Sequence, residues 1–320
     1  MWVPLILLIL GFITLVWSAD RFLSGAAACA TNLGLSKMLI GLTVVSLGTS
    51  APEILVALFA AIDGNPLLAV GNALGSNIAN IGLVLGITAL VAPLPFSLQV
   101  RRAELPWLLG ATFLALFLLF DRYLSIWDGC MLLVGLSAIM WRLVRSQKQP
   151  NQEISPSLQE ELDELPDMTT LQAVAWLVVG LLILLVSAQV LVYAASTIAQ
   201  RLGVSDMIIG LTIVAVGTSL PELAATIGSA IKGHPDIAIG NVVGSNILNI
   251  LAVLAVPALV APTAIDFVAF WRDGGMMLAL TLMLALFAYG INSRAVITRF
   301  EGAVMLMAWV GYNLLLIQQA

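Results

Sequence analysis

Glu53 and Glu222 carry the most informative chemistry in this sequence, because each acid lies inside a long apolar run. Each closes the same short motif, Gly-Thr-Ser-x-Pro-Glu, at residues 48–53 and 217–222. An ionised side chain at the centre of a membrane costs at least ~2.5–3.5 kcal/mol and needs a compensating partner. Since no Lys or Arg lies at comparable depth in these runs, we expect a bound cation to neutralise both acids.

The same motif predicts a broken helix that exposes further oxygen atoms. Pro52 and Pro221 lack a backbone N–H, so the carbonyl groups of Gly48 and Gly217 lose their helical hydrogen bonds. Unpaired backbone at membrane depth is tolerated where it is buried in protein or lines a polar cavity. Hydroxyl and carbonyl ligands are therefore expected from Thr49, Ser50, Thr218 and Ser219.

A second polar segment follows each motif and supplies neutral side chains. Its members recur every fourth residue, so they lie along one face of a helix. This face comprises Asn72, Ser76 and Asn80 in the first segment and Asn241, Ser245 and Asn249 in the second. The candidate ligands are Ser76, Asn80, Ser245 and Asn249. Hydrogen bonding between helices is an equally good interpretation of Asn72, Asn77, Asn241 and Asn246. Close approach of another backbone is expected at Gly71, Gly75, Gly240 and Gly244.

The ligand types restrict the cation that such a site would hold. Carboxylate, hydroxyl, amide and carbonyl oxygens suit Ca2+ or Na+, whereas zinc, copper and iron sites use the thiolate and imidazole ligands that this set lacks. Mg2+ fits less well because it retains its waters, and Mn2+ stays open. Calcium is therefore the leading divalent cation.

Both polar segments belong to an internal duplication. Residues 41–81 align with residues 210–250 without a gap, and 22 of the 41 positions are identical. The identities concentrate in Gly, Pro, Glu, Ser, Thr and Asn, which a membrane core ordinarily avoids. The repeat is therefore interpreted as functional.

Composition places this duplication in a membrane. The 320 residues are 61% apolar and 10% charged, which is more apolar surface than one soluble core can bury. Ten apolar runs are long enough to cross ~30 Å of hydrocarbon. They lie near 1–19, 37–62, 66–95, 105–120, 124–145, 171–198, 207–231, 236–262, 273–291 and 297–317. The predicted fold is an all-α polytopic membrane protein with ten transmembrane helices, of which helices 2 and 7 are broken.

The distribution of charge predicts the orientation. With the amino terminus outside, ten of the 13 Lys and Arg residues fall on the cytoplasmic side, as the positive-inside rule requires. Both termini then lie outside the cytoplasm. Because each half has five helices, the second half enters the membrane from the opposite side. We therefore predict two inverted repeats, at 1–145 and 171–320, joined by an acidic cytoplasmic linker at 146–170.

Other functional classes are disfavoured. A net charge of −5 without a basic patch argues against nucleic-acid binding, and no obligate protein partner is evident. No span contains a Ser/His pair or a histidine cluster, so we do not expect an enzyme. A cation channel is also disfavoured, because it would need a continuous ring of pore residues. The charges expected only to anchor helix ends at the interface are Arg101, Arg102, Glu104, Arg272 and Asp273.

At these motifs the chain resembles the calcium/cation antiporter superfamily, specifically its bacterial sodium/calcium exchanger branch, the inner-membrane calcium/sodium antiporters. Both repeats of that family carry Gly-Thr-Ser-x-Pro-Glu and Gly-Asn-x-x-Gly-Ser-Asn-x-x-Asn, as both halves do here. The resemblance implies that Glu53 and Glu222 coordinate the central calcium. It implies oxygens for calcium and sodium from Thr49, Ser50, Thr218 and Ser219, sodium-site serines at Ser76 and Ser245, and pocket-facing residues at Asn80 and Asn249. Some relatives carry Asp at the position of Asn249, so a third carboxylate is absent here.

Together these features predict a secondary active transporter that exchanges calcium for sodium by alternating access. No cofactor is expected apart from the transported Ca2+ and Na+ as bound ions, and the surrounding partner is the lipid bilayer of a bacterial inner membrane. An empty site with two ionised glutamates should cross slowly, because it carries uncompensated like charge. Protons could discharge the same acids, so calcium/proton exchange, or exchange of another divalent cation for protons, is the alternative.

Overall fold

The chain is almost entirely helical in the computed structural model, which describes residues 2–33, 50–98, 100–146, 168–231, 235–290 and 295–319. The first half contains α1 (Trp2–Asn32), α4 (Ala51–Ile62), α5 (Pro66–Ala79), η2 (Asn80–Leu85), α6 (Gly86–Val91), β1 (Leu94–Pro95), η3 (Val100–Glu104), α7 (Leu105–Leu118), η4 (Leu119–Asp121), β2 (Tyr123–Leu124) and α8 (Ile126–Ser146). The second half contains α10 (Thr170–Leu202), α11 (Asp206–Ile209), η5 (Gly210–Val214), α12 (Ala215–Thr218), α13 (Leu220–Ile231), α14 (Pro235–Leu248), η6 (Asn249–Val253), α15 (Ala255–Val260), β3 (Thr263–Ala264), α16 (Phe267–Ala269), η7 (Phe270–Gly274), α17 (Gly275–Tyr289), β4 (Val296–Ile297) and α18 (Arg299–Gln318). All η elements are π-helical except η4, which is a 3-10 turn.

The order of elements in the first half recurs in the second. The series α5, η2, α6, β1 corresponds to α14, η6, α15, β3, each element starting 169 residues later. The short strands pair antiparallel between the halves, with Leu94 opposite Ile297 and Leu124 opposite Thr263. Helices also pack against the opposite half: α6 of the first half contacts α18 of the second, and α15 of the second half contacts α8 of the first. The two halves therefore interlock around one shared core.

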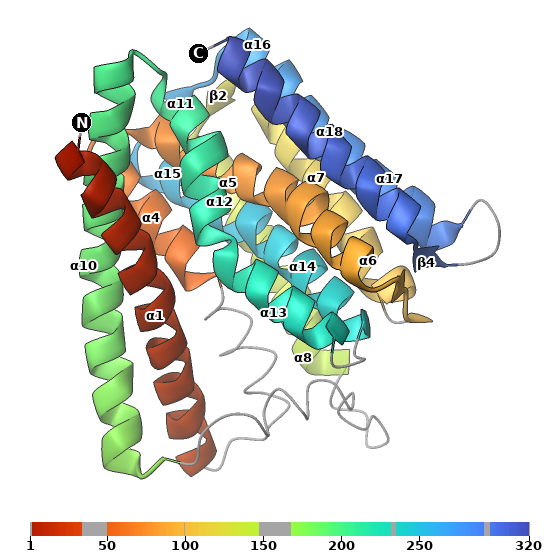
Figure 1. The fold of residues 1–320 in the computed structure, drawn as a ribbon, viewed down its shortest axis with the longest axis horizontal. Coiled ribbons are helices and arrows are strands. Elements are labelled where there is room, and N and C mark those ends of the chain that lie inside the picture. The colour runs from red at the N-terminus through yellow and green to blue at the C-terminus, as the bar shows by residue number, and fades with distance from the viewer. Residues whose placement is uncertain are drawn as a thin grey trace.

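Two long helices, α1 and α10, run side by side along one edge of the molecule (Figure 1). Glycines let them approach closely: a Cβ added at Gly25 would lie 2.4 Å from the backbone nitrogen of Leu177, and one added at Gly180 would lie 2.6 Å from that of Phe22. Any larger residue would force these backbones apart. The pair is therefore held by direct backbone packing.

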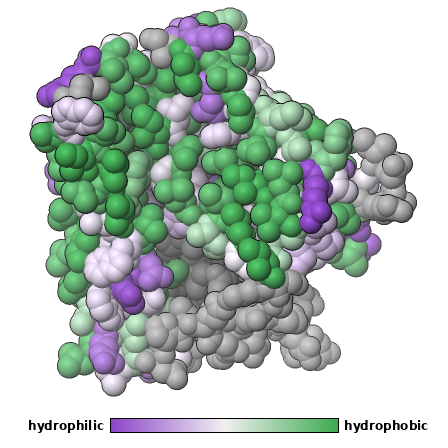
Figure 2. Space-filling model, viewed as in Figure 1, coloured by the Kyte–Doolittle hydropathy of each residue, from purple (hydrophilic) through white to green (hydrophobic). Residues whose placement is uncertain are grey.

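Seven helices among the described residues are long and apolar enough to cross a membrane. They are Trp2–Cys29, Pro66–Val91, Val100–Asp121, Thr170–Leu202, Ala238–Val260, Phe267–Tyr289 and Arg299–Gln318. The bent pair Asp206–Thr218 and Leu220–Ile231 makes an eighth if it is one span. Hydrophobic side chains cover much of the face shown in Figure 2. The molecule is thus an all-α membrane protein, whereas the count of ten spans and the inversion stay predictions. Residues 147–167 of the predicted linker lie outside the described residues.

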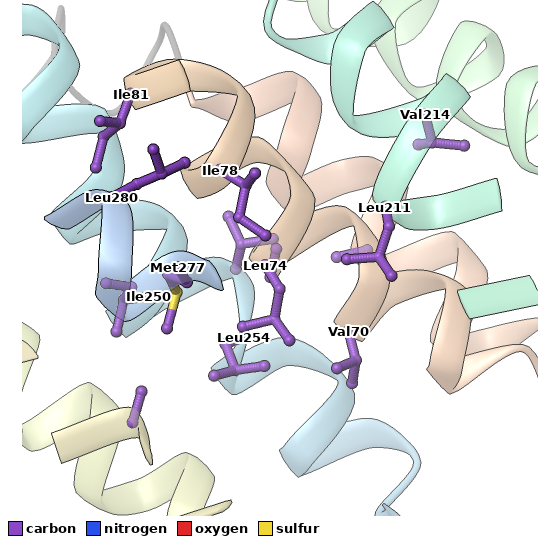
Figure 3. Close-up of a cluster of buried hydrophobic side chains, with 14 of the residues drawn as sticks. Val70, Leu74, Ile78, Ile81, Leu211, Val214, Ile250, Leu254, Met277 and Leu280 are labelled. Atoms are coloured by element: carbon purple, nitrogen blue, oxygen red, sulfur yellow. The ribbon is translucent and has the colours of Figure 1, made fainter. Parts of the chain in front are cut away.

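The apolar face of α5 fixes the direction of its polar face. Figure 3 shows part of the core, in which side chains from α5 and η2 meet side chains from the second half. These residues are Val70, Leu74, Ile78, Ile81, Leu211, Val214, Ile250, Leu254, Met277 and Leu280. Positions 70, 74 and 78 are two residues from positions 72, 76 and 80, about 200° around a helix with 3.6 residues per turn. Packing of the apolar face therefore turns Asn72, Ser76 and Asn80 away from this cluster.

Asp273 corrects one expectation from the sequence. Its side chain is fully buried in η7, where Oδ1 lies 2.6 Å from Arg272 Nε and Oδ2 lies 2.9 Å from Arg272 Nη2. Tyr312 of α18 donates its hydroxyl hydrogen to Asp273 Oδ1 at 2.8 Å. The prediction that this charge only anchors a helix end at the interface is therefore wrong, because burial is possible once Arg272 and Tyr312 both bond the carboxylate.

Candidate cation site

The break in the second half lies at the Gly-Thr-Ser-x-Pro-Glu motif. Helix α12 ends at Thr218, α13 begins at Leu220, and the two segments are bent by 43°. Pro221 is the second residue of α13 and has no N–H to donate to the carbonyl of Gly217. Ser219 lies at the bend with φ −85° and ψ 4°. The bend places Glu222 in the first turn of α13, beside the positive end of the helix dipole.

The first half has the same local geometry where it is described. Helix α4 begins at Ala51 with Pro52 as its second residue and Glu53 in its first turn. Ser50 precedes it with φ −90° and ψ 2°, close to the values of Ser219. Thr49, a predicted ligand, lies outside the described residues. The two motifs therefore present their serines and glutamates in one shared backbone conformation.

The two carboxylates are buried without compensation from the described parts of the chain. Glu53 is 0% exposed and Glu222 is 1% exposed, and no described donor forms a hydrogen bond to any of their four carboxylate oxygens. The two groups are close enough to repel each other electrostatically. Among the described residues, Arg21 forms an ion pair with Asp20 at 4.0 Å and Arg272 forms one with Asp273 at 2.6 Å, and neither pair involves the two glutamates. Because unpaired buried charge is costly, this geometry favours a cation between the acids.

Neutral oxygen atoms from both halves share this condition. They are buried and have no hydrogen-bond partner among the described residues. The predicted ligands in this condition are Ser50 Oγ, Ser76 Oγ, Asn80 Oδ1, Ser219 Oγ and Asn249 Oδ1, and Asn77 Oδ1 shares it. The elements that carry them pack together, since α4 contacts α5 and η6, and α13 contacts α14 and η2. Carboxylates with hydroxyl and amide oxygens form a ligand set for a hard cation.

Both site asparagines stand at the start of a π-helix. Asn80 opens η2 and Asn249 opens η6, each directly after an α-helix. A π-turn adds a residue to the helical turn and often marks a functional site. Sequence reasoning missed this feature, because residues 81–85 and 250–254 are apolar or glycine at every position, so the shift of about 100° caused by one extra residue does not change the pattern. The π-helices re-aim the side chains that follow Ser76 and Ser245.

Asn72 joins the two halves beside the acids. Its Nδ2 donates to the backbone carbonyl of Glu53 at 3.3 Å, and its Oδ1 accepts from Thr218 Oγ1 at 3.3 Å. Thr218 also lies near the Glu53 carboxylate, and its single hydroxyl hydrogen can be donated to Asn72 Oδ1 or to the carbonyl oxygen of Ala215, each 3.3 Å away. The hydrogen-bonding interpretation is thus confirmed for Asn72. Thr218, a predicted ligand, keeps lone pairs for a cation.

The remaining polar positions lie on α14. Ser245, another predicted ligand, is buried at 3% exposure one turn before Asn249. Asn241 Nδ2 donates to Thr226 Oγ1 at 3.3 Å, so it links α14 to α13. Both asparagines therefore donate within their own half, but among the described bonds only Asn72 also accepts a hydrogen bond from the other half.

Glycines allow the first half to press against the second. A Cβ at Gly71 would lie 2.4 Å from the carbonyl oxygen of Met207, and one at Gly75 would lie 2.7 Å from Leu211 Cα. The predicted close approach is confirmed at both positions. The segment that the duplication would place against Gly240 and Gly244, near residues 38–46, lies outside the described residues.

Comparison with known proteins gives a consistent assignment. The family described as sodium/calcium exchanger protein matches residues 3–144 and 172–318. CaxA of Alkalimonas amylolytica is 47% identical over 99% of each chain, and the inner membrane protein YrbG of Escherichia coli is 42% identical over 88% of each chain. A solved structure of the sodium-calcium exchanger NCX_Mj, soaked with Na+ and Sr2+, has a TM-score of 0.65, 32% identity and coverage of 96% of each chain.

These similarities extend over both halves, including the four motifs. They confirm the resemblance that the motifs predicted. Since the family match covers most of the sequence and the relatives align along nearly their full length, this chain belongs to the sodium/calcium exchanger protein family.

Proposed function

We propose that this protein is a secondary active transporter that exchanges calcium for sodium. The observation that carries the proposal is the pair of buried carboxylates, Glu53 and Glu222. No described hydrogen-bond donor or basic side chain compensates their negative charge. One Ca2+ or several Na+ ions neutralise two carboxylates equally well. The two ions therefore compete for one site, and that competition is the basis of exchange.

The neutral ligands complete the coordination in this proposal. Ca2+ takes six to eight oxygen ligands at distances of roughly 2.3–2.6 Å, more than two carboxylates supply. The rest are proposed to come, at different stages of the transport cycle, from Thr49, Ser50, Thr218, Ser219, Ser76, Ser245, Asn80 and Asn249. Since Asn249 is neutral, all formal negative charge at the site comes from Glu53 and Glu222.

The packing of helices from each half against the other half supports an alternating-access mechanism. Inverted repeats commonly place a substrate site at their interface and open it to each side in turn. We infer that residues 1–145 and 171–320 are such repeats, with ten spans and both termini outside the cytoplasm. The inner-membrane description of YrbG supports the same location for this chain.

Charge balance explains why transport would be coupled. A site that crosses the membrane with two ionised glutamates and no cation carries like charges into a medium of low dielectric constant. The empty carrier therefore reorients slowly, whereas carriers loaded with calcium or sodium reorient faster. Each calcium ion that moves one way then requires sodium to return the site.

Calcium/proton exchange is the second candidate, and the same unpaired carboxylates favour it, because protons also remove their charge. The test is calcium uptake into proteoliposomes at clamped voltage, driven by an outward sodium gradient or by an outward proton gradient. Uptake driven by sodium alone supports the proposal. Uptake driven by protons alone replaces it with calcium/proton exchange.

A cation channel predicts a different kinetic result. At clamped voltage, flux through a channel is not accelerated by the counter-ion on the opposite side. Saturable uptake that lumenal sodium accelerates would therefore exclude a channel. Flux that ignores lumenal sodium and protons would contradict both forms of exchange.

A further inference from the structure

Asn77 and Asn246 occupy equivalent positions in the two halves and contact each other. Asn246 Nδ2 donates to the backbone carbonyl of Asn77 at 3.4 Å, and the two residues are 169 positions apart, the length of the repeat. A residue that touches its own counterpart must lie beside the axis that relates the repeats. This contact therefore marks the local centre of the duplicated site.

The contact fixes the orientation of a candidate ligand. A carbonyl oxygen only accepts hydrogen bonds, so the amide nitrogen of Asn246 must face Asn77 and its amide oxygen must face away. That oxygen accepts a hydrogen bond from Asn80 Nδ2 at 3.0 Å. Asn80 Oδ1 is thereby turned the other way, where it is buried without a described partner. The chain from Asn77 through Asn246 thus presents Asn80 as an oxygen ligand.

The bond that symmetry would pair with this one, from Asn249 Nδ2 to Asn77 Oδ1, is not formed. Asn249 is the counterpart of Asn80, yet no described residue bonds its Nδ2 or its Oδ1. Asn77 Nδ2 donates instead to Ala73 O at 2.8 Å, one turn back on its own helix. Asn77 Oδ1, the acceptor that symmetry would offer to Asn249 Nδ2, is also buried and unpaired among the described residues. Both ends of the missing bond are therefore present.

We propose that Asn77 and Asn246 form an asparagine toggle, which selects whether Asn80 or Asn249 presents its amide oxygen to the cation. In the state described here Asn246 reaches across the axis and holds Asn80. In the state facing the other side of the membrane, Asn77 donates to the carbonyl of Asn246 and its Oδ1 accepts from Asn249. Asn246 then donates to the carbonyl of Val242, as Asn77 now donates to that of Ala73.

The two arrangements exclude each other because either side chain must occupy the space on the axis to reach its counterpart's carbonyl. The toggle rests on the proposed alternating-access exchange and adds positioning residues to it. Asn246 serves calcium binding on one face of the membrane, and Asn77 serves binding on the opposite face. Each acts through Asn80 or Asn249 and does not itself bind the ion.

The test measures calcium/calcium exchange, which needs neither sodium nor proton coupling, in right-side-out and inside-out membrane vesicles. The variants are Asn246→Leu and Asn77→Leu, which keep side-chain size and remove the amide. The matched control is Thr88→Val on the same span as Asn77, because the buried Thr88 hydroxyl donates to the Val84 carbonyl of that span and to no other described residue. Asn246→Ser and Asn77→Ser replace the Leu variants if those fail to fold.

We expect Asn246→Leu to raise the calcium KM at one membrane face and Asn77→Leu to raise it at the other. The expected increase is about three- to tenfold, the effect of losing one buried hydrogen bond. Equal shifts at both faces, shifts of both variants at the same face, or unchanged KM values would overturn the toggle. Absence of calcium exchange in the unsubstituted protein would overturn the proposed function, and the toggle with it.

Discussion

Replacing Glu222 by Gln isolates the charge argument on which the proposed function depends. The substitution keeps the size of a side chain that is 1% exposed, and it breaks no hydrogen bond formed by the described residues. Ca2+ bound against the single remaining carboxylate leaves one uncompensated positive charge. A charge at the membrane centre costs ~2.5–3.5 kcal/mol on insertion scales. At ~1.4 kcal/mol per factor of ten, this corresponds to a loss of roughly 60- to 300-fold.

Calcium/calcium exchange in proteoliposomes measures this loss directly. We expect both Glu222→Gln and Glu53→Gln to slow exchange by that factor, because the two acids are equally buried. Sodium/sodium exchange should fall by less, since one Na+ balances the remaining carboxylate. Asp63→Asn is the matched control: Asp63 caps the far end of the helix that carries Glu53 and is exposed. It should exchange calcium at the unsubstituted rate.

Thermal unfolding of the same variants tests the charge argument independently of transport. Without bound cations, repulsion between Glu53 and Glu222 destabilises the folded state, so either Gln variant should melt at a higher temperature in cation-free buffer. Calcium at 100 times its Kd should stabilise the unsubstituted protein by ~2.7 kcal/mol and stabilise the variants much less. Folded Gln variants that exchange calcium at the unsubstituted rate, or that lose calcium and sodium exchange in equal proportion, would refute the charge argument.

Two further predictions concern packing around the site. Gly71→Ala should destabilise the protein by ~1–3 kcal/mol, because the added Cβ would lie 2.4 Å from the backbone oxygen of Met207. Gly110→Ala, where a Cβ meets no described atom within 4 Å, is the control in the same thermal melt, and equal melting temperatures would contradict the packing argument. Tyr312→Phe should cost ~1.5–3 kcal/mol through loss of the 2.8 Å hydrogen bond to the buried Asp273 carboxylate. Its exchange rate should be unchanged once it is folded, and a stable but inactive variant would show that Tyr312 serves transport instead.

Much of the site was predictable because its chemistry is local in the sequence. An acid after a proline inside an apolar run predicts both a broken helix and a need for a cation, and the 43° bend before Glu222 confirms the break. Four-residue spacing predicted one polar face on α5. The close approach at Gly71 followed from residue size alone. Each of these inferences uses only neighbours within a turn or two of helix.

Other features depend on which helices meet. Thr218 and Ser219 are adjacent hydroxyls in one motif, yet Thr218 donates to Asn72 and Ser219 has no described partner. Nothing in their spacing distinguishes them, because the bend between α12 and α13 decides where each one points. Asp273 was misjudged for a related reason. Its burial depends on Tyr312, which is 39 residues away.

Residue types and spacing alone established that this protein lies in a membrane and that it is duplicated, and they predicted that its polar motifs supply oxygen atoms suited to a hard cation. These properties follow from residue types and their local spacing. The packing of distant helices was needed to show which oxygens lack a described partner, and that Asn80 is bonded to Asn246 while Asn249 has no bond to a described residue. A side chain's hydrogen bonds depend on contacts between distant segments, so two copies of one motif can have identical residues and different partners.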